Sequence, residues 1–67
     1  MSIEITVNGN PHTIPKNSSL TELLELLGVE GRLAVDINGE IIPKSTHSDQ
    51  LIADSDRIEI VHAIGGG

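Results

Sequence analysis

The residues of this sequence best placed to do chemistry are the last three, Gly65, Gly66 and Gly67. Glycine has no Cβ, so a run of three can enter a channel that is too narrow for other residues. With Ile64, the run can extend roughly 13–14 Å and present a terminal carboxylate at its end. A carboxylate becomes an electrophile only after activation, for example as a mixed anhydride with a nucleotide that a nucleophile then displaces. The pattern therefore indicates acyl activation at the carboxylate of Gly67.

The same residues also allow an interpretation without chemistry. Chain ends are commonly disordered, and glycine has the greatest backbone freedom, so we expect a domain over 1–63 and a flexible tail over 64–67. A tail that does nothing is the alternative to a reactive one. The sequence contains no P-loop or other glycine-rich strand-to-helix turn that would hold ATP phosphates. A separate enzyme would therefore do the activation, and we expect this chain to be a protein co-substrate and not an enzyme.

The charge of the chain excludes one class of partner. Ten acidic residues against four basic ones give a net charge of -6, and there are no aromatic residues. Such a chain is poorly suited to binding nucleic acid, which needs a basic surface. The charge serves either solubility or long-range steering toward a basic partner. The start of the chain lacks the features of a secretory signal, and no apolar stretch has membrane-spanning length, so we expect a cytoplasmic protein without a membrane partner.

Side chains that bind metals or act as nucleophiles are few. The chain has no Cys, hence no disulfide, thiolate metal site or cysteine nucleophile, which fits a reducing cytosol. His12, His47 and His62 fall in three separate elements and lack the close spacing of a metal site. Asp54 and Asp56 do not follow a calcium-loop pattern, and Asp is a favoured turn residue. We expect neither a metal nor a cofactor bound by this chain.

Three segments alternate apolar and polar residues with the period of a half-buried strand: Ile3–Val7, Leu33–Ile37 and Arg57–His62. Asn8-Gly9-Asn10 and Asn38-Gly39 supply residues that tolerate positive φ, which hairpin turns need. The first two strands are therefore each expected to begin a hairpin.

Two short partner strands follow these turns. The first covers 12–14, and Pro11 and Pro15 on either side confine it to a sheet edge or to a short length. The second covers 40–42. The polar segment after it is expected to form a loop or a single helical turn, anchored by Leu51–Ile52.

One helix is predicted between the hairpins. Ser19 lies three residues before Glu22, which is the spacing of a capping box, and Gly28 occupies the position of a C-terminal cap. Leucines recur at i, i+3, i+4 and i+7, namely at Leu20, Leu23, Leu24 and Leu27. A helix of about two turns does not persist alone in water, so the leucine stripe must pack on the sheet.

The element order predicts a two-layer α+β domain. We expect a ubiquitin-like β-grasp, with a mixed sheet of four to five strands, the first and last strands paired at its centre, and one main helix on one face. The opposite face is then free to dock a partner. Exposed apolar contacts beside the tail are expected from Val61, Ala63 and Ile64. No dimer seam is evident, so a monomer is expected.

Two segments, Ala34–Lys44 and Asp54–Gly67, carry a resemblance to a known family. A β-grasp pattern that ends on two glycines resembles the ubiquitin-like sulfur carriers, and it is most similar to the ThiS family of thiamine-biosynthesis sulfur carriers. The resemblance covers nearly the whole chain. It departs from the family at Ser55, where the turn often has glycine.

The resemblance implies a sulfur-transfer cycle. An E1-like adenylyltransferase, which uses ATP, would adenylate Gly67. A persulfide sulfur donor would displace AMP to leave a thiocarboxylate, and thiazole synthase would accept the sulfur. Only Gly66 and Gly67 match the functional residues of the family, with Gly67 as the sulfur-bearing residue and Gly66 as its conduit. The residues themselves, and not the resemblance, lead us to expect partner binding at Gly65, Ile64, Ala63 and Val61.

Three other functions remain open at this stage. One is the small subunit of molybdopterin synthase, which uses a similar thiocarboxylate, although the short chain and the lack of aromatic residues favour the thiamine carrier. Another is a ubiquitin-like modifier that forms isopeptide bonds to lysines. The last is a β-grasp interaction module with an idle tail.

Overall fold

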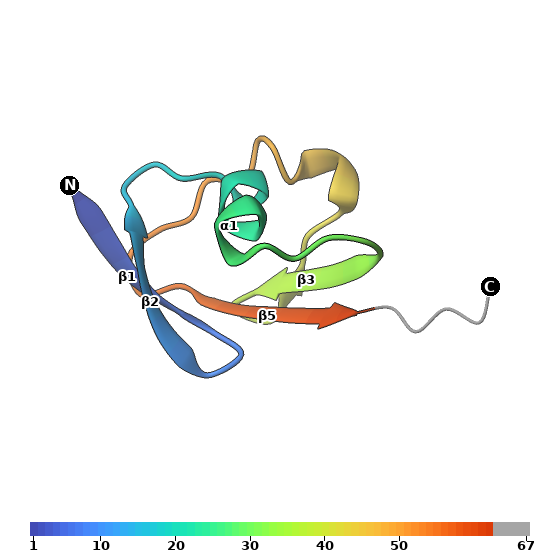
Figure 1. The fold of residues 1–67 in the computed structure, drawn as a ribbon, viewed down its shortest axis with the longest axis horizontal. Helices are drawn as coiled ribbons and strands as arrows, with labels where there is room; N and C mark the ends of the chain where they lie inside the picture. Colours follow the sequence, from blue (N-terminus) through green and yellow to red (C-terminus); the bar gives the residue numbers. More distant parts are fainter. Residues whose placement is uncertain (63–67) are drawn as a thin grey trace.

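A computed structural model describes residues 1–62 of the chain. Five strands and one α-helix form two layers, and the helix lies across one face of the sheet (Figure 1). Residues 63–67 lie outside the described residues, and the predicted tail with them. The elements in chain order are β1 (Ser2–Val7), β2 (Asn10–Pro15), α1 (Leu20–Leu27), β3 (Leu33–Ile37), β4 (Glu40–Ile41), the 3₁₀ helix η1 (Lys44–Thr46) and β5 (Arg57–His62).

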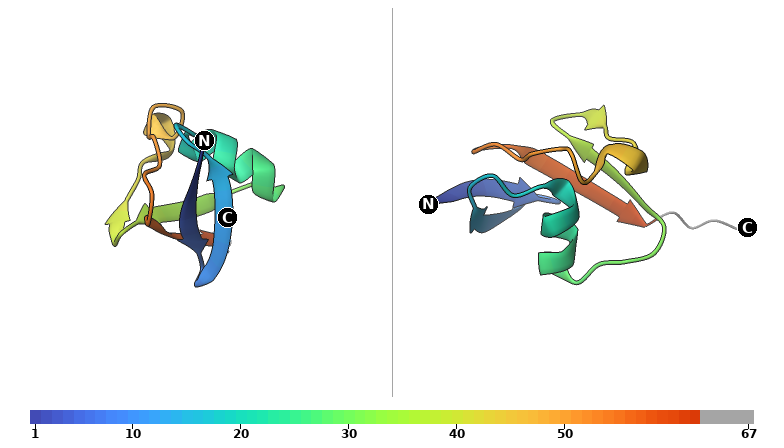
Figure 2. Two further views of the ribbon diagram at one scale, coloured as in Figure 1. Left: turned by 90° about the vertical axis from the view of Figure 1, so that its left-hand side faces the viewer. Right: turned by 90° about the horizontal axis from the view of Figure 1, so that it is seen from above.

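The sheet has the order β2-β1-β5-β3-β4, so the first and last strands are neighbours at its centre (Figure 2). β1 and β5 run parallel, with Thr6 opposite Arg57 and Val7 opposite Ile58. The other three strand pairs are antiparallel. This mixed sheet with one covering helix confirms the predicted β-grasp.

Both predicted hairpin turns are confirmed. Asn8 and Gly9 have φ of 50° and 85°, and Asn38 and Gly39 have φ of 53° and 87°. Two consecutive positive φ values define the type I′ turn, whose twist matches that of the flanking strands. Asparagine followed by glycine is the sequence that takes this conformation at the lowest cost.

β2 is an edge strand, but it is longer than predicted, because it runs from Asn10 to Pro15 and so includes both prolines. Val7 and Asn10 directly flank the two-residue turn and are opposite each other. From this pair onward, alternate residues of β2 bond to β1, and Lys16 continues the series by donating to the carbonyl of Met1 at 2.9 Å. The two prolines occupy the intervening positions, whose backbone nitrogens face away from β1. They therefore remove no ladder bond, and they leave fewer donors for another strand at this edge.

Helix α1 has the predicted ends. The Ser19 hydroxyl accepts from the backbone N–H of Glu22 at 3.1 Å, and the Glu22 carboxylate accepts from the N–H of Ser19 at 2.9 Å. Gly28 closes the helix with φ of 70°. Among the described residues, no helix combines the length and the hydrophobicity needed to cross a membrane.

The aliphatic core lies between α1 and the sheet. Leu20 and Leu23 are both 0% exposed, as the leucine stripe predicts. The expected anchor at Leu51–Ile52 is half correct, because Ile52 is 4% exposed and Leu51 is 57% exposed. The N–H of Ile52 donates to the carbonyl of Ser18 at 2.9 Å. Adjacent residues in an extended segment point to opposite sides, so burial of Ile52 turns Leu51 to solvent.

Ser55 occupies the turn position where the resembled family often has glycine. Its φ of 71° lies in the left-handed region, which costs a residue with a Cβ roughly 1–2 kcal/mol. The turn is kept by tertiary bonds, since the Ser55 N–H donates to the carbonyl of Glu4 at 2.7 Å. The backbone geometry thus explains the glycine preference at this position.

Candidate functional site

The predicted reactive residues lie just beyond the described part of the chain. Gly67, Gly66, Gly65, Ile64 and Ala63 all fall outside the described residues, so their proposed roles stay predictions. The last described residue is His62, which ends β5 on the opposite side of the molecule from Met1 (Figure 1). The structure therefore describes the end of β5, which precedes the proposed tail in the sequence.

The end of β5 is supported differently on its two sides. On one side β3 runs alongside to the last residue, with Ala34 opposite Val61 and Leu33 opposite His62. On the other side the paired residues of β1 reach only as far as Ile58. Beyond that point the support of β5 comes from a side chain.

That side chain is Asn8, in the turn between β1 and β2. Its amide Nδ2 donates to the carbonyl of Ile60 at 3.2 Å, and its Oδ1 accepts from the N–H of Ile60 at 2.8 Å. Its backbone N–H donates to the carbonyl of Ile58 at 2.9 Å. The Asn8 amide thus mimics a strand peptide and continues the ladder one step beyond the end of β1.

The other hairpin turn holds the beginning of β5. The Asn38 N–H donates to the carbonyl of Arg57 at 2.7 Å, and its Oδ1 accepts from the N–H of Arg57 at 2.9 Å. Its Nδ2 donates to Asp56 Oδ1 at 2.9 Å. Asp54 Oδ1 accepts from the N–H of Glu4 at 2.8 Å. Asp54 and Asp56 are structural turn residues, as predicted, with the added task of tying this turn to the sheet.

Sequence reasoning assigned Asn8 and Asn38 only to turns and missed their bonds to β5. Asn-Gly has the same appearance whether or not the amide has a distant partner. The partner of Asn8 is 52 residues away in the sequence, and no local pattern marks it.

We predict that Asn8→Gly destabilises the domain by about 1–3 kcal/mol, because it leaves the N–H and carbonyl of Ile60 without their partners. Glycine accepts the positive φ of Asn8, so the turn itself is not strained. Asn17→Gly is the matched control, since Asn17 also has positive φ, at 68°, and lies in an exposed loop. Urea unfolding gives the stability, and hydrogen exchange should show lost protection at the Ile60 amide. Equal effects of the two variants would contradict the role of the Asn8 side chain.

The predicted exposure of Val61 is confirmed. Its side chain is 60% exposed and lies on the sheet face opposite α1, beside Ala34. Ile41 is 75% exposed on the same face. A partner contact at Val61 stays a prediction.

The three histidines lie apart from one another. His47 is 7% exposed, and its Nε2 lies 3.1 Å from the carbonyl oxygen of Ile42. A carbonyl only accepts, so Nε2 carries the proton, and the bond ties the end of η1 to the segment that follows β4. His12 lies in β2 and His62 at the end of β5. Within residues 1–62, no three side chains of the metal-ligating types gather.

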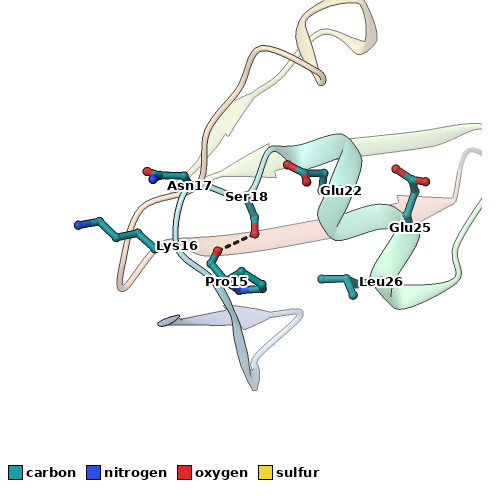
Figure 3. A pocket seen from close by; sticks show the side chains of 7 residues that line it. All are labelled: Pro15, Lys16, Asn17, Ser18, Glu22, Glu25 and Leu26. Carbon is teal, nitrogen blue, oxygen red and sulfur yellow. Dashed lines mark hydrogen bonds between the residues drawn. The ribbon is translucent and has the colours of Figure 1, made fainter. Parts of the chain in front are cut away.

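A surface hollow of about 420 Å³ lies beside α1 and the loop that precedes it (Figure 3). Two of its polar side chains already have partners in the fold. The Ser18 hydroxyl donates to the carbonyl of Pro15 at 2.6 Å, and Glu22 belongs to the capping box. The other two charged residues that line the hollow are Lys16 and Glu25, and the side chain of Lys16 points away from Glu25 (Figure 3). The hollow therefore has no converging groups for a ligand.

Known proteins resemble this chain along nearly its full length. A sequence profile of the ThiS family matches residues 5–67. The crystal structure of thiamine biosynthesis protein ThiS from Geobacter metallireducens is 32% identical, has a TM-score of 0.85 and covers 97% of this chain and 100% of its own. Protein ycf40 of Porphyra purpurea is 34% identical over 67 residues, which are 98% of this chain and 94% of that protein.

A second kind of relative is much longer than this chain. Thiazole synthase of Paramagnetospirillum magneticum strain AMB-1 is 38% identical over 66 residues, which are 97% of this chain. These residues make up 20% of that protein, and the same holds for a thiazole synthase from Magnetococcus marinus that is 35% identical. The chain thus spans about a fifth of the length of these curated relatives.

Proposed function

The chain belongs to the ThiS family, and on this premise we propose that it is a sulfur carrier of thiamine biosynthesis whose sulfur is borne by Gly67. The observation that carries the proposal is the extent of the family match, which runs to residue 67 and so includes all three terminal glycines. The structural neighbour from Geobacter metallireducens, a thiamine biosynthesis protein, supports the same pathway over the molybdopterin alternative.

The proposed cycle begins with activation of the carboxylate. An E1-like adenylyltransferase transfers AMP from ATP to a Gly67 oxygen and releases pyrophosphate. The terminal sulfur of a donor persulfide attacks the acyl carbon, the bond to AMP breaks, and an acyl disulfide forms. A thiol then attacks the donor sulfur of that disulfide, so the thiol and the donor become a disulfide and Gly67 keeps a thiocarboxylate.

In this proposal the folded domain is the part that the partner enzymes recognise, and the glycine tail is a narrow reactive end. Its proposed active group is the Gly67 carboxylate, and Gly66 passes through the channels of the partner enzymes without a side chain. The fold holds β5 through Asn8 and Asn38, so the tail starts from a rigid strand. ATP and the catalytic side chains belong to the activating enzyme, and we propose no cofactor bound by this chain. A reducing cytoplasm suits a thiocarboxylate intermediate, and we propose it as the location.

Thiazole synthase is the proposed acceptor. The relatives that bear this name contain a segment like the present chain within a polypeptide about five times longer. Joining a carrier to its acceptor raises their effective concentration to the millimolar range. That arrangement supports thiazole synthase as the enzyme that this chain supplies with sulfur.

Intact-mass spectrometry tests the proposal. The full chain is incubated with the E1-like adenylyltransferase of the same organism, ATP, a persulfide donor and a thiol. We expect a gain in mass equal to the exchange of one oxygen for sulfur, and no gain when ATP is omitted. The product should then support thiazole formation by thiazole synthase. An unchanged mass with an adenylyltransferase that activates another carrier of the family would disprove the proposal.

A further inference from the structure

The two hairpin turns that hold β5 share a chemically labile sequence. In Asn8-Gly9, and again in Asn38-Gly39, an asparagine precedes a glycine. Asparagine is one of the thermolabile residues of proteins. Because glycine lacks a Cβ and has the greatest backbone freedom, its nitrogen approaches the side chain of a preceding asparagine with little hindrance. Both asparagines are exposed to water, so sequence and exposure favour spontaneous deamidation at both turns.

Deamidation at an asparagine that precedes glycine takes two steps. The backbone nitrogen of the glycine attacks Cγ of the asparagine, a C–N bond forms, and ammonia leaves, which closes a succinimide ring. Water then adds to one of the two ring carbonyls, and the bond from that carbonyl to the ring nitrogen breaks. Opening at Cγ gives aspartate, whereas opening at the main-chain carbonyl gives isoaspartate, whose main chain runs through Cβ. The net change consumes one water and releases one ammonia.

The fold delays the first of these steps at both turns. The Asn8 amide is bonded at both polar atoms to the peptide of Ile60, at 3.2 and 2.8 Å. The Asn38 amide is also bonded at both atoms, to Asp56 Oδ1 and to the N–H of Arg57, each at 2.9 Å. An amide fixed at both atoms cannot turn its Cγ toward the next backbone nitrogen. The reaction therefore requires the turn and β5 to separate locally.

The products no longer hold β5. A carboxylate in place of the Asn8 amide has no hydrogen to donate to the carbonyl of Ile60, so two acceptors face each other. A carboxylate in place of the Asn38 amide faces Asp56 Oδ1, where the donor now lies at 2.9 Å, and like charges at this distance repel. Isoaspartate adds a main-chain carbon, which does not fit a two-residue type I′ turn and so disturbs the register of the hairpin.

We propose that Asn8 and Asn38 are sites of spontaneous deamidation, and that conversion of either residue releases β5 from the turn concerned. The bonded state preserves the asparagines, and each local opening exposes them to an irreversible change. β5 directly precedes the proposed reactive tail in the sequence. A chain modified at Asn8 is therefore expected to be a poorer substrate of the activating enzyme, and this consequence rests on the proposed function.

Ageing of the full chain at alkaline pH tests the two sites. Peptide mapping by mass spectrometry locates the exchange of an amide NH₂ for OH, and a protein isoaspartate methyltransferase labels the isoaspartate. Deamidation at both sites should be roughly 5- to 150-fold slower in the folded chain than in urea, a factor that corresponds to two hydrogen bonds. Equal rates in both states would overturn the proposed delay. Absence of product in the folded chain after roughly 150 times the half-time in urea would overturn the sites themselves.

Three matched substitutions separate loss of the bonds from added charge. Asn8→Asp and Asn38→Asp reproduce one product of the reaction. Asn17→Asp is the control, since it adds the same charge at an exposed residue that also has positive φ, at 68°, but lies in the loop before α1. The first two variants should lower Tm by roughly 4 °C or more, and the control by less than half as much. Equal shifts in all three would assign the effect to charge and overturn the proposed release of β5.

Pyrophosphate exchange with the E1-like adenylyltransferase tests the consequence for the carrier. We expect kcat/KM to fall roughly tenfold or more with Asn8→Asp, because the reactive end is no longer positioned, and to stay within twofold with Asn17→Asp. If the unmodified chain is not adenylated, the proposed function fails, whereas mapping and Tm still decide the modification sites. If Asn8→Asp is adenylated like the unmodified chain, the expected loss of carrier activity is wrong.

Discussion

Deletion of Gly67 is expected to abolish thiocarboxylate formation. The carboxylate then belongs to Gly66 and lies about 3.3–3.6 Å short of its former reach. A misplacement of about 1 Å can cost roughly 100-fold in rate, so no product should be detected by intact mass under conditions that convert the unmodified chain fully. Pyrophosphate exchange by the adenylyltransferase measures the same loss at the first chemical step.

The fold provides the control for this deletion. The core of the described residues, which extends from Ile3 to Ile60, keeps every side chain in this deletion, so the far-ultraviolet circular dichroism and the urea midpoint should not change. A second variant, Gly66→Val, keeps the length and adds a side chain, and it should also fail if the partner channel is narrow. Retention of a tenth or more of the activity after deletion of Gly67 would contradict the assignment of the reactive carboxylate.

Leu23→Ala is expected to destabilise the described fold strongly. Leu23 of α1 is 0% exposed and belongs to the buried aliphatic core. Truncation of a buried leucine costs about 2–5 kcal/mol, through lost transfer free energy and the cavity that remains. The total stability of a domain this size is about 3–10 kcal/mol. A large part of the Leu23→Ala protein should therefore be unfolded at 37 °C.

The same helix supplies the control. Leu26 is 64% exposed, so Leu26→Ala removes the same atoms from a solvent-facing position and should change stability by about 0.5 kcal/mol or less. Two-state urea unfolding of both variants gives the difference directly. Similar losses for the two would mean that the core is not arranged as described.

Local patterns accounted for most of the fold because they depend on neighbours in the sequence. The capping box at Ser19 and Glu22 needs two residues three apart. The turns at Asn8 and Asn38 need two residues that accept positive φ. Only a few neighbouring residues decide whether these requirements are met, and the predicted cap and both turns were confirmed. The prediction that Leu51 anchors the loop was wrong, because local hydrophobicity does not show which of two adjacent apolar residues faces the core.

The sequence by itself determined the chemistry proposed for this protein. Three terminal glycines need no fold to be recognised, and the lack of a P-loop motif in the sequence is the reason why we propose that a partner does the activation. These are properties of composition and order, and folding does not alter them. The reactive group at Gly67 is accordingly argued from the chain alone and from its family.

Only the tertiary structure decided how the end of β5 is supported and which side chains lie opposite one another in the sheet. Asn8 bonds to Ile60, and Asp36 lies opposite Glu59, so each pair brings together residues that are far apart in the sequence. The order β2-β1-β5-β3-β4 brings these residues together. Such pairs depend on the register of long-range strand pairing, and a shift of one residue would turn every side chain to the other face. Long-range register is set by burial of the whole core, so no short segment of this sequence contains it.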